Sequence, residues 1–190
     1  SETVLFGGSD GLTFYGDTFT YNGTAWTAES PATNPTGRVG PAMAFHTGRS
    51  AAVLYGGYDG TYYDETWEWN GTDWTLRTGT MPPGRQYHAM AYDAGRAVVV
   101  VYGGADGSGY ISDTWEYGAA GTWSAAAAGP TSRSSHSMAM DLARGRAIVF
   151  GGDDGSAFLN ETWEYGGAWS AGASAPALLT ARWQLAMAYD

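Results

Sequence analysis

The feature that most constrains this chain is a Gly-Gly pair that recurs four times, each time directly after a run of β-branched and aromatic residues. The pairs are Gly7-Gly8, Gly56-Gly57, Gly103-Gly104 and Gly151-Gly152. Their first glycines lie 49, 47 and 48 residues apart. Two further series share the period: Arg38, Arg85, Arg133, Arg182, and Trp26, Trp74, Trp123, Trp169. Three markers with one period of this length indicate tandem structural repeats.

Each repeat is interpreted as four β-strands. The first strand follows the arginine, where residues 86–92 alternate large and small side chains. The second strand is the apolar run before Gly-Gly, as expected for a strand that is covered on both faces. The third strand is aromatic, as in residues 65–69, and the fourth carries the late tryptophan. Asn22-Gly23 and Asn70-Gly71 predict hairpin turns between the third and fourth strands, and no stretch predicts a helix.

Four-stranded units repeated at this length are typical of β-propeller blades. The Gly-Gly pair, the Tyr or Phe before it, the aromatic third strand and the spaced tryptophans run over essentially all 190 residues. In these features the chain resembles the kelch-repeat β-propeller family. The resemblance implies one all-β domain, residues 1–190, with four blades. The predicted blades are 38–78, 85–126 and 133–172, with a first blade made from 1–30 plus 182–190.

The two ends of the sequence predict how the ring closes. The chain begins with a second strand and ends with residues 182–190, which have the pattern of a first strand. We expect this last strand to pair with Val4–Gly8, which would remove open sheet edges. Four blades are few for the family that the chain resembles, so three arrangements stay open. They are a monomeric four-bladed ring, two chains in a larger ring, and an excised or engineered piece of a longer array.

Composition excludes several classes of function. The formal net charge of −10 argues against a nucleic-acid partner and against anionic membranes. All nine basic residues are arginine, so lysine-dependent chemistry has no nucleophile here. Without cysteine there is no thiolate metal site, and no Tyr-Cys cross-link of the kind that copper-radical oxidases on kelch propellers use. We predict no cofactor and no metal, and the composition fits a bacterial protein of either the extracellular space or the cytoplasm.

The predicted strand directions place the arginines and the long loops on one face of the disc, opposite the short hairpin turns. With the first strand innermost, as in kelch folds, Arg38, Arg85, Arg133 and Arg182 would surround the axis. A ring of guanidinium groups binds carboxylates or phosphates through paired hydrogen bonds. The alternative is that these arginines are structural and pair locally with Glu68, Glu116 and Glu164 or with loop aspartates.

The long loops after the second strands carry aromatic residues that differ from repeat to repeat. The candidates for ligand contact are Tyr15, Tyr58, Tyr62, Tyr63, Tyr110 and Phe158. Exposed aromatic rings on loops suit contacts with sugars or with other proteins. The alternative is that this variation reflects only the tolerance of loop tips to change.

Other polar residues are better explained by structure. The loop Asp-Gly pairs at 10, 59, 106 and 154 are turn signals, and one carboxylate per blade does not make a calcium site. His88 and His136 occupy equivalent positions and are expected to pack in the fold, because a third metal ligand is not evident. No serine lies in a nucleophile-elbow motif, so no catalytic residue is assigned.

These observations predict a non-catalytic propeller that binds a protein segment or a glycan on the arginine and long-loop face. A purely structural ring is the first alternative. A second is an enzyme that acts on a sugar-like substrate through Arg and Asp or Glu at the axis.

Overall fold

The computed structural model describes residues 2–190 and is all-β apart from one short 3-10 turn, η1 (Thr47–Arg49). The first repeat contains β1 (Thr3–Phe6), β2 (Thr18–Tyr21) and β3 (Trp26–Ala28). The second contains β4 (Ala42–His46), β5 (Ala51–Tyr55), β6 (Thr66–Trp69) and β7 (Trp74–Arg77). The third contains β8 (Ala89–Asp93), β9 (Val98–Tyr102), β12 (Thr114–Gly118) and β13 (Trp123–Ala125), with a small hairpin of β10 (Ala105–Asp106) and β11 (Gly109–Tyr110). The fourth contains β14 (Ser137–Asp141), β15 (Arg146–Phe150), β16 (Thr162–Tyr165) and β17 (Trp169–Ala171).

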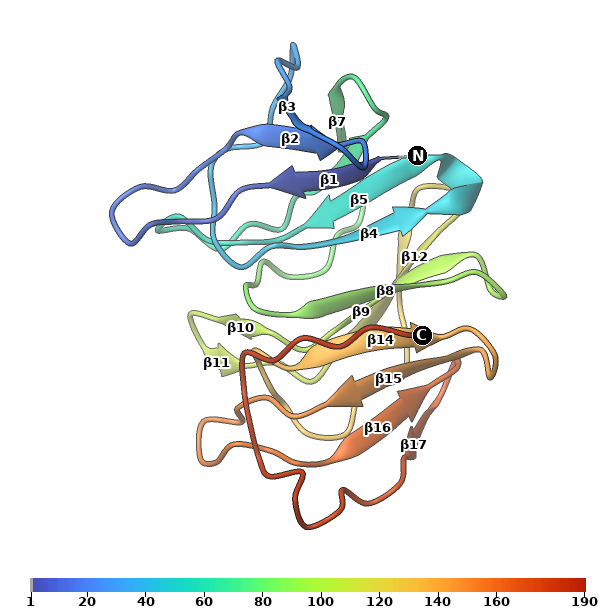
Figure 1. Ribbon diagram of the computed structural model, residues 1–190. Coiled ribbons are helices and arrows are strands. Elements are labelled where there is room, and N and C mark those ends of the chain that lie inside the picture. The colour runs from blue at the N-terminus through green and yellow to red at the C-terminus, as the bar shows by residue number, and fades with distance from the viewer. Residues whose placement is uncertain (1) are drawn as a thin grey trace.

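Each repeat forms its own antiparallel sheet, and the strands follow one another from the inner edge to the outer edge. The second, third and fourth repeats are four-stranded, in the orders β4-β5-β6-β7, β8-β9-β12-β13 and β14-β15-β16-β17. The predicted all-β class and the four-stranded repeat are therefore confirmed. The sheets follow each other around an arc with β4, β8 and β14 along its inner side (Figure 1), an arrangement that is β-propeller-like.

The hydrophobic core lies between neighbouring sheets. Three buried clusters occupy the three sheet-to-sheet interfaces, and each combines second-strand aliphatic residues with third- and fourth-strand aromatics. At the inner edge, Met90 of β8 packs in the cluster that includes Ala42 and Ala44 of β4. Met138 of β14 packs in the same way with Ala89 and Ala91 of β8. The small residues of each first strand thus make room for a methionine of the next repeat.

The predicted pairing of residues 182–190 with Val4–Gly8 is not formed within the described residues. The first sheet has three strands, in the order β1-β2-β3, and β1 is its open edge. Residues 182–190 instead run beside β14, on the inner side of the fourth repeat (Figure 1). Burial reflects this difference, because all five residues of β5 are buried and only Phe6 of β1 is.

Candidate functional site

Three of the four predicted arginines are completely buried. Arg38, Arg85 and Arg133 each have 0% exposure. Each donates from Nη1 to a carbonyl oxygen of the first glycine in its own repeat's Gly-Gly pair, at 3.1 Å in all three cases. Their carboxylate partners stand just before the third strand and are Glu65, Asp113 and Glu161. The guanidinium groups therefore fasten the first, second and third strands of each sheet together.

This geometry corrects the expectation of an arginine ring that faces a ligand. The guanidinium groups of Arg38, Arg85 and Arg133 are buried and donate to groups of the protein itself, so they offer no free charge to an external anion. The arginines do pair locally, as the alternative held, although not with the glutamates that it named. Glu68, Glu116 and Glu164 instead accept from a second arginine series, whose members are Arg49, Arg96 and Arg144.

Arg182 differs from its three equivalents. It is exposed, and it donates only to Thr180, from Nε to the carbonyl oxygen at 2.9 Å and from Nη2 to Oγ1 at 3.3 Å. No carboxylate pairs with it within residues 2–190. The position equivalent to Glu65 in the first repeat is Asp17, which lies in the sheet that lacks a first strand.

The predicted loop aromatics lie on the side of the molecule where the second strands end, at the left of Figure 1. Tyr15, Tyr110 and Phe158 are 40%, 37% and 50% exposed. The hydroxyl of Tyr15 donates to Asp10 at 2.9 Å, and that of Tyr110 crosses to Asp153 of the next repeat at 3.2 Å. These three rings therefore present apolar surface to solvent, and the hydroxyl groups of the two tyrosines stay hydrogen-bonded to aspartates.

The remaining three tyrosines are more structural than predicted. Tyr58 and Tyr62 pack on each other with ring centroids 4.7 Å apart. Tyr63 covers the guanidinium carbon of Arg38 at 3.8 Å and donates to Asp59 at 2.7 Å. Tyr63 thus shields a buried charge, and Tyr58, Tyr62 and Tyr63 are all only partly exposed.

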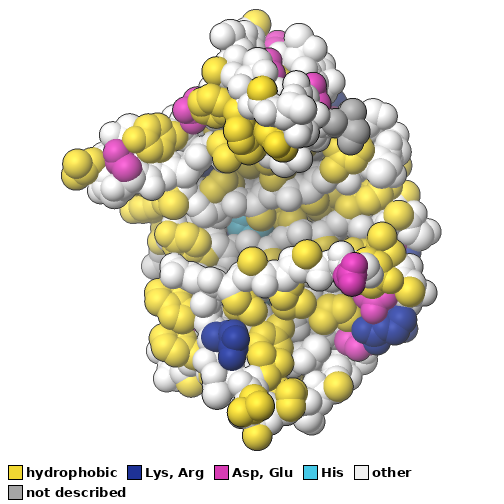
Figure 2. Space-filling model, viewed as in Figure 1, with side chains coloured by type: hydrophobic (Ala, Val, Ile, Leu, Met, Phe, Trp, Pro, Cys, Tyr) yellow, Lys and Arg dark blue, Asp and Glu magenta, His cyan; other side chains and the backbone are white. Residues whose placement is uncertain are grey.

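A pocket opens where the first strands begin, and it is lined by equivalent residues from successive repeats. Its volume is about 200 Å³, and we call it the inner-edge pocket. Its lining residues are Gly40, Pro41, Tyr87, His88, Ser135, His136, Gln184 and Leu185. Figure 2 shows a hollow across the middle of the molecule with a histidine side chain at its floor.

Backbone hydrogen bonds between repeats build the rim of this pocket. The backbone N–H of Tyr87 donates to the Gly40 carbonyl oxygen at 2.9 Å. In the same way the N–H of Ser135 donates to the Tyr87 carbonyl, and that of Gln184 to the Ser135 carbonyl, both at 2.8 Å. All four residues have a positive φ, and three of them are not glycine, with φ values of 55°, 54° and 50°. Left-handed backbone at non-glycine residues costs roughly 1–3 kcal/mol each and concentrates at functional sites.

His88 and His136 form the polar interior of the inner-edge pocket. Each is 6% exposed, and neither ring nitrogen of either residue has a hydrogen-bond partner within the described residues. Burial, reinforced by the charge of Arg133, lowers the pKa of His136 to about 3. Burial and the neighbouring Arg85 likewise hold the pKa of His88 well below its usual range. Both imidazoles are therefore neutral near pH 7, and each offers one donor and one acceptor.

Sequence reasoning placed both histidines correctly as packed residues and missed the pocket that they line. The rim residues Tyr87, Ser135 and Gln184 differ in type, so no motif marks them. The one available signal was Gly40, because a glycine at the equivalent place in another repeat suggests a left-handed backbone.

The loop aspartates behave as turn residues. Asp10 Oδ1 accepts from the backbone N–H groups of Leu12 and Thr13 at 2.9 and 2.8 Å, and Asp154 does the same three repeats later. Among residues 2–190, no cluster of three or more metal-ligating side chains occurs. No helix of the described chain is long and apolar enough to cross a membrane.

No protein-family model matches this chain, and no curated protein matches it either. The fold and the inner-edge pocket therefore carry the functional argument.

Proposed function

We propose that the chain is a kelch-type β-propeller whose ring is completed when residues 182–190 pair with the free edge of a β1 strand. The support is the repeat itself, in which a buried arginine, a Gly-Gly pair and a third-strand carboxylate recur in the same contact pattern. In this proposal the protein is a non-catalytic binding module. Its ligand face is the side that carries the long loops and the inner-edge pocket.

The observation that carries the binding proposal is the inner-edge pocket, which joins equivalent residues of successive repeats and has a rim of left-handed, non-glycine backbone. The ring nitrogens of both histidines are buried inside the fold, so the two rings line the floor of the pocket, and a ligand would form its hydrogen bonds with the rim, where Ser135 and Gln184 lie. Because both imidazoles are neutral and no carboxylate or free guanidinium lines the pocket, the ligand that fits is uncharged. The absence of a carboxylate among the lining residues also supports a non-catalytic role.

Exposed aromatic rings around the pocket favour a glycan within this class of ligand. Tyr87 is on the rim and is 37% exposed. Trp183, which directly precedes the rim residue Gln184, is 44% exposed and stacks on Phe158, with ring centroids 5.5 Å apart and an angle of 4° between the planes. Flat aromatic surfaces next to hydroxyl-binding groups match the apolar faces and hydroxyls of a neutral sugar.

A screen of immobilised neutral and acidic glycans, followed by calorimetry on the best neutral oligosaccharide, tests this proposal. We expect binding that Tyr87→Ala and His136→Leu each weaken at least tenfold. Leucine is the natural residue at the equivalent position 185, so His136→Leu should preserve the packing. Leu12→Ala is the matched control, because Leu12 is 95% exposed on a loop.

Three results would contradict the proposal in different ways. Selective capture of acidic glycans would contradict the neutral pocket. Binding that is unchanged by both variants would move the ligand elsewhere on the loop face. Capture of extended peptides in place of sugars would favour a protein segment as the ligand.

A further inference from the structure

The same set of contacts joins each sheet to the one before it. The fourth-strand tryptophan donates from its indole nitrogen to a threonine Oγ1 at the start of the preceding sheet's third strand. The three pairs are Trp74–Thr18 at 2.8 Å, Trp123–Thr66 at 2.8 Å and Trp169–Thr114 at 2.9 Å. The tryptophan ring also packs on the last aromatic residue of the preceding second strand, as in Tyr102–Trp169 at 4.5 Å between centroids. This unit of contact fixes the rotation from one sheet to the next.

A second recurring contact lies one strand further in. Tyr117 donates to Glu68 of the preceding sheet at 2.7 Å, and Tyr165 donates to Glu116 at 2.7 Å. Burial and the hydrogen bond to Glu116 together raise the pKa of Tyr165 to about 12, so the hydroxyl keeps its proton and acts as the donor. The two interfaces among the last three sheets thus have a tryptophan and a tyrosine on one side, and a threonine and a glutamate on the other. Between the first and second sheets Trp69 and Thr20 stand in the places of the tyrosine and the glutamate.

The first sheet carries the donor half of this interface without a partner. Trp26 is 53% exposed, and its ring contacts Tyr21 as the equivalent rings contact each other in the inner sheets. Neither the Trp26 indole nitrogen nor the Tyr21 hydroxyl has a hydrogen-bond partner within residues 2–190, and Leu5 on β1 is 43% exposed. We call this surface the N-terminal face.

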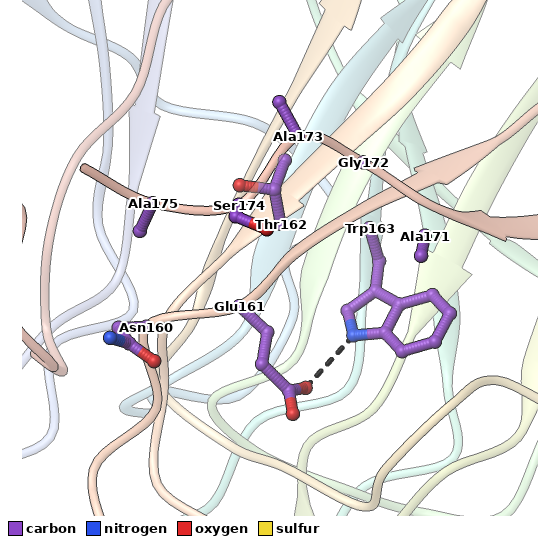
Figure 3. Close-up of a pocket in the computed structure, with 9 residues that line it drawn as sticks. All are labelled: Asn160, Glu161, Thr162, Trp163, Ala171, Gly172, Ala173, Ser174 and Ala175. Carbon is purple, nitrogen blue, oxygen red and sulfur yellow. Dashed lines mark hydrogen bonds between the residues drawn. The ribbon is translucent and has the colours of Figure 1, made fainter.

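The fourth sheet carries the acceptor half, which we call the C-terminal face. It presents Thr162 and Glu164 at the positions of Thr66 and Glu68, with Phe150 at the position of Tyr55. Two hollows of about 390 and 320 Å³ meet at Thr162. In Figure 3, Trp163 turns toward Glu161, to which it donates at 2.9 Å, while Thr162 points the other way, toward Ala173 and Ser174. The larger hollow is lined by Phe150 and Thr162. In the inner interfaces the tryptophan ring of the next sheet lies against the residues equivalent to these two.

Residues 182–190 occupy the place of a fifth inner strand. Gly152 N–H donates to the Arg182 carbonyl at 2.8 Å, which repeats the bonds from Gly57 to Arg85 and from Gly104 to Arg133 at the same length. The first strand of a further sheet is therefore already in place on the C-terminal face, and its second-strand edge is unpaired. The missing neighbour is a β1 strand, together with the Asp17 that would pair with Arg182.

We propose that the C-terminal face binds the N-terminal face of a second copy of this chain, head to tail, so that two copies close one ring of eight sheets. In this ring β1 of each copy pairs with residues 182–190 of the other. Trp26 enters the hollow beside Thr162, and Tyr21 donates to Glu164. The occupant is a second copy because the two unpartnered surfaces match the two sides of an interface that the chain already forms three times.

The curvature of the chain favours two copies over closure within one copy. All three internal interfaces share the same contact lengths, so the rotation per sheet is nearly constant. After four repeats at this rotation, residues 182–190 and β1 are still unpaired. Rings of four to eight blades are the usual range for propellers, and two copies give eight. Two head-to-tail contacts in a closed pair leave no free sheet edge.

Disulfide trapping tests this arrangement, because the chain has no cysteine of its own. In the second repeat Ala44 lies opposite Val53, and the equivalent pair across the new contact is Ala188 and Val4. Val4→Cys and Ala188→Cys chains are prepared separately, mixed and oxidised. We expect a cross-linked species of twice the 20.0 kDa chain mass from the mixture and only monomer from either variant alone.

Light scattering on the unmodified protein should give the two-copy mass. Trp26→Ala should shift it to one copy with an unchanged circular dichroism spectrum, whereas the loop control Leu12→Ala should not. An intrachain disulfide in a Val4→Cys/Ala188→Cys double variant at 20.0 kDa would overturn the proposal in favour of self-closure. A concentration-independent monomer without cross-links, or a mass that keeps growing beyond two copies, would overturn it as well.

Discussion

The indole nitrogen of Trp123 lies 2.8 Å from Thr66 Oγ1, and this hydrogen bond ties the outermost strand of one sheet to the preceding sheet across 57 residues of sequence. Trp123 is 6% exposed and Thr66 is completely buried. The bond therefore forms away from water, where loss of one partner leaves the other unsatisfied.

A double-mutant cycle on this pair should show strong coupling. Trp123→Phe keeps most of the ring and removes the donor, so we expect the free energy of unfolding to fall by about 1–3 kcal/mol. The Thr66 hydroxyl still donates to Met81 Sδ at 3.3 Å and loses only the donor from which it accepts, so adding Thr66→Val should recover at most about 1 kcal/mol of that loss. Urea denaturation of the four proteins measures the coupling. Strictly additive effects would show that the tryptophans act only through packing.

The buried arginines should be essential to stability. Arg85→Met leaves Asp113 and the Gly103 carbonyl without their arginine donor; because Asp113 is 38% exposed and water can solvate it, we expect a loss of about 1–3 kcal/mol. The control is Arg144→Met, because the Arg144 side chain is 53% exposed and its pairs with Asp141 and Glu164 are surface contacts that contribute little to stability. Equal losses for the two variants in thermal or urea unfolding would argue against this structural role.

The inner-edge histidines should make the protein less stable in mild acid. The pKa of folded His136 is about 3, below its ordinary value of 6.5, so the unfolded chain binds a proton that the folded chain excludes. The contribution of His136 to stability is therefore greatest above pH 6.5 and falls as the pH drops toward 3, by about 2 kcal/mol between pH 7 and pH 5, and His88 acts in the same direction. Between pH 7 and pH 5, the free energy of unfolding of His136→Leu should therefore fall by about 2 kcal/mol less than that of the unmodified protein. An unchanged pH dependence would mean that the folded protein accepts the proton.

The first glycine of each Gly-Gly pair should not tolerate a side chain. Gly56 has a φ of +72°, and a Cβ there would lie 2.6 Å from the Arg85 carbonyl oxygen. Gly71, in a hairpin turn, has a φ of +99°, and a Cβ added to Gly71 would have no atom within 4 Å. Gly71→Ala should cost about 1–2 kcal/mol from backbone strain alone. Gly56→Ala should cost more, since it adds a clash with backbone, and similar melting temperatures for the two variants would contradict this reading.

The sequence determined the repeat, the strand pattern and the all-β class. Those follow from local rules, since Asn-Gly turns, alternating first strands and apolar second strands specify antiparallel hairpins without reference to distant residues. The same locality explains why the loop aspartates were correctly assigned to turns.

Only the tertiary structure decided what the arginines, the histidines and the chain ends do. The sequence pattern of an arginine at the start of a strand is the same whether the side chain faces a ligand or a carboxylate 27 or 28 residues away. In three of the four repeats the arginine is buried and pairs with the carboxylate. The inner-edge pocket arises where His88 and His136 of separate repeats meet. The unpaired N- and C-terminal faces arise because the rotation between sheets is a property of side-chain packing, which no single repeat contains.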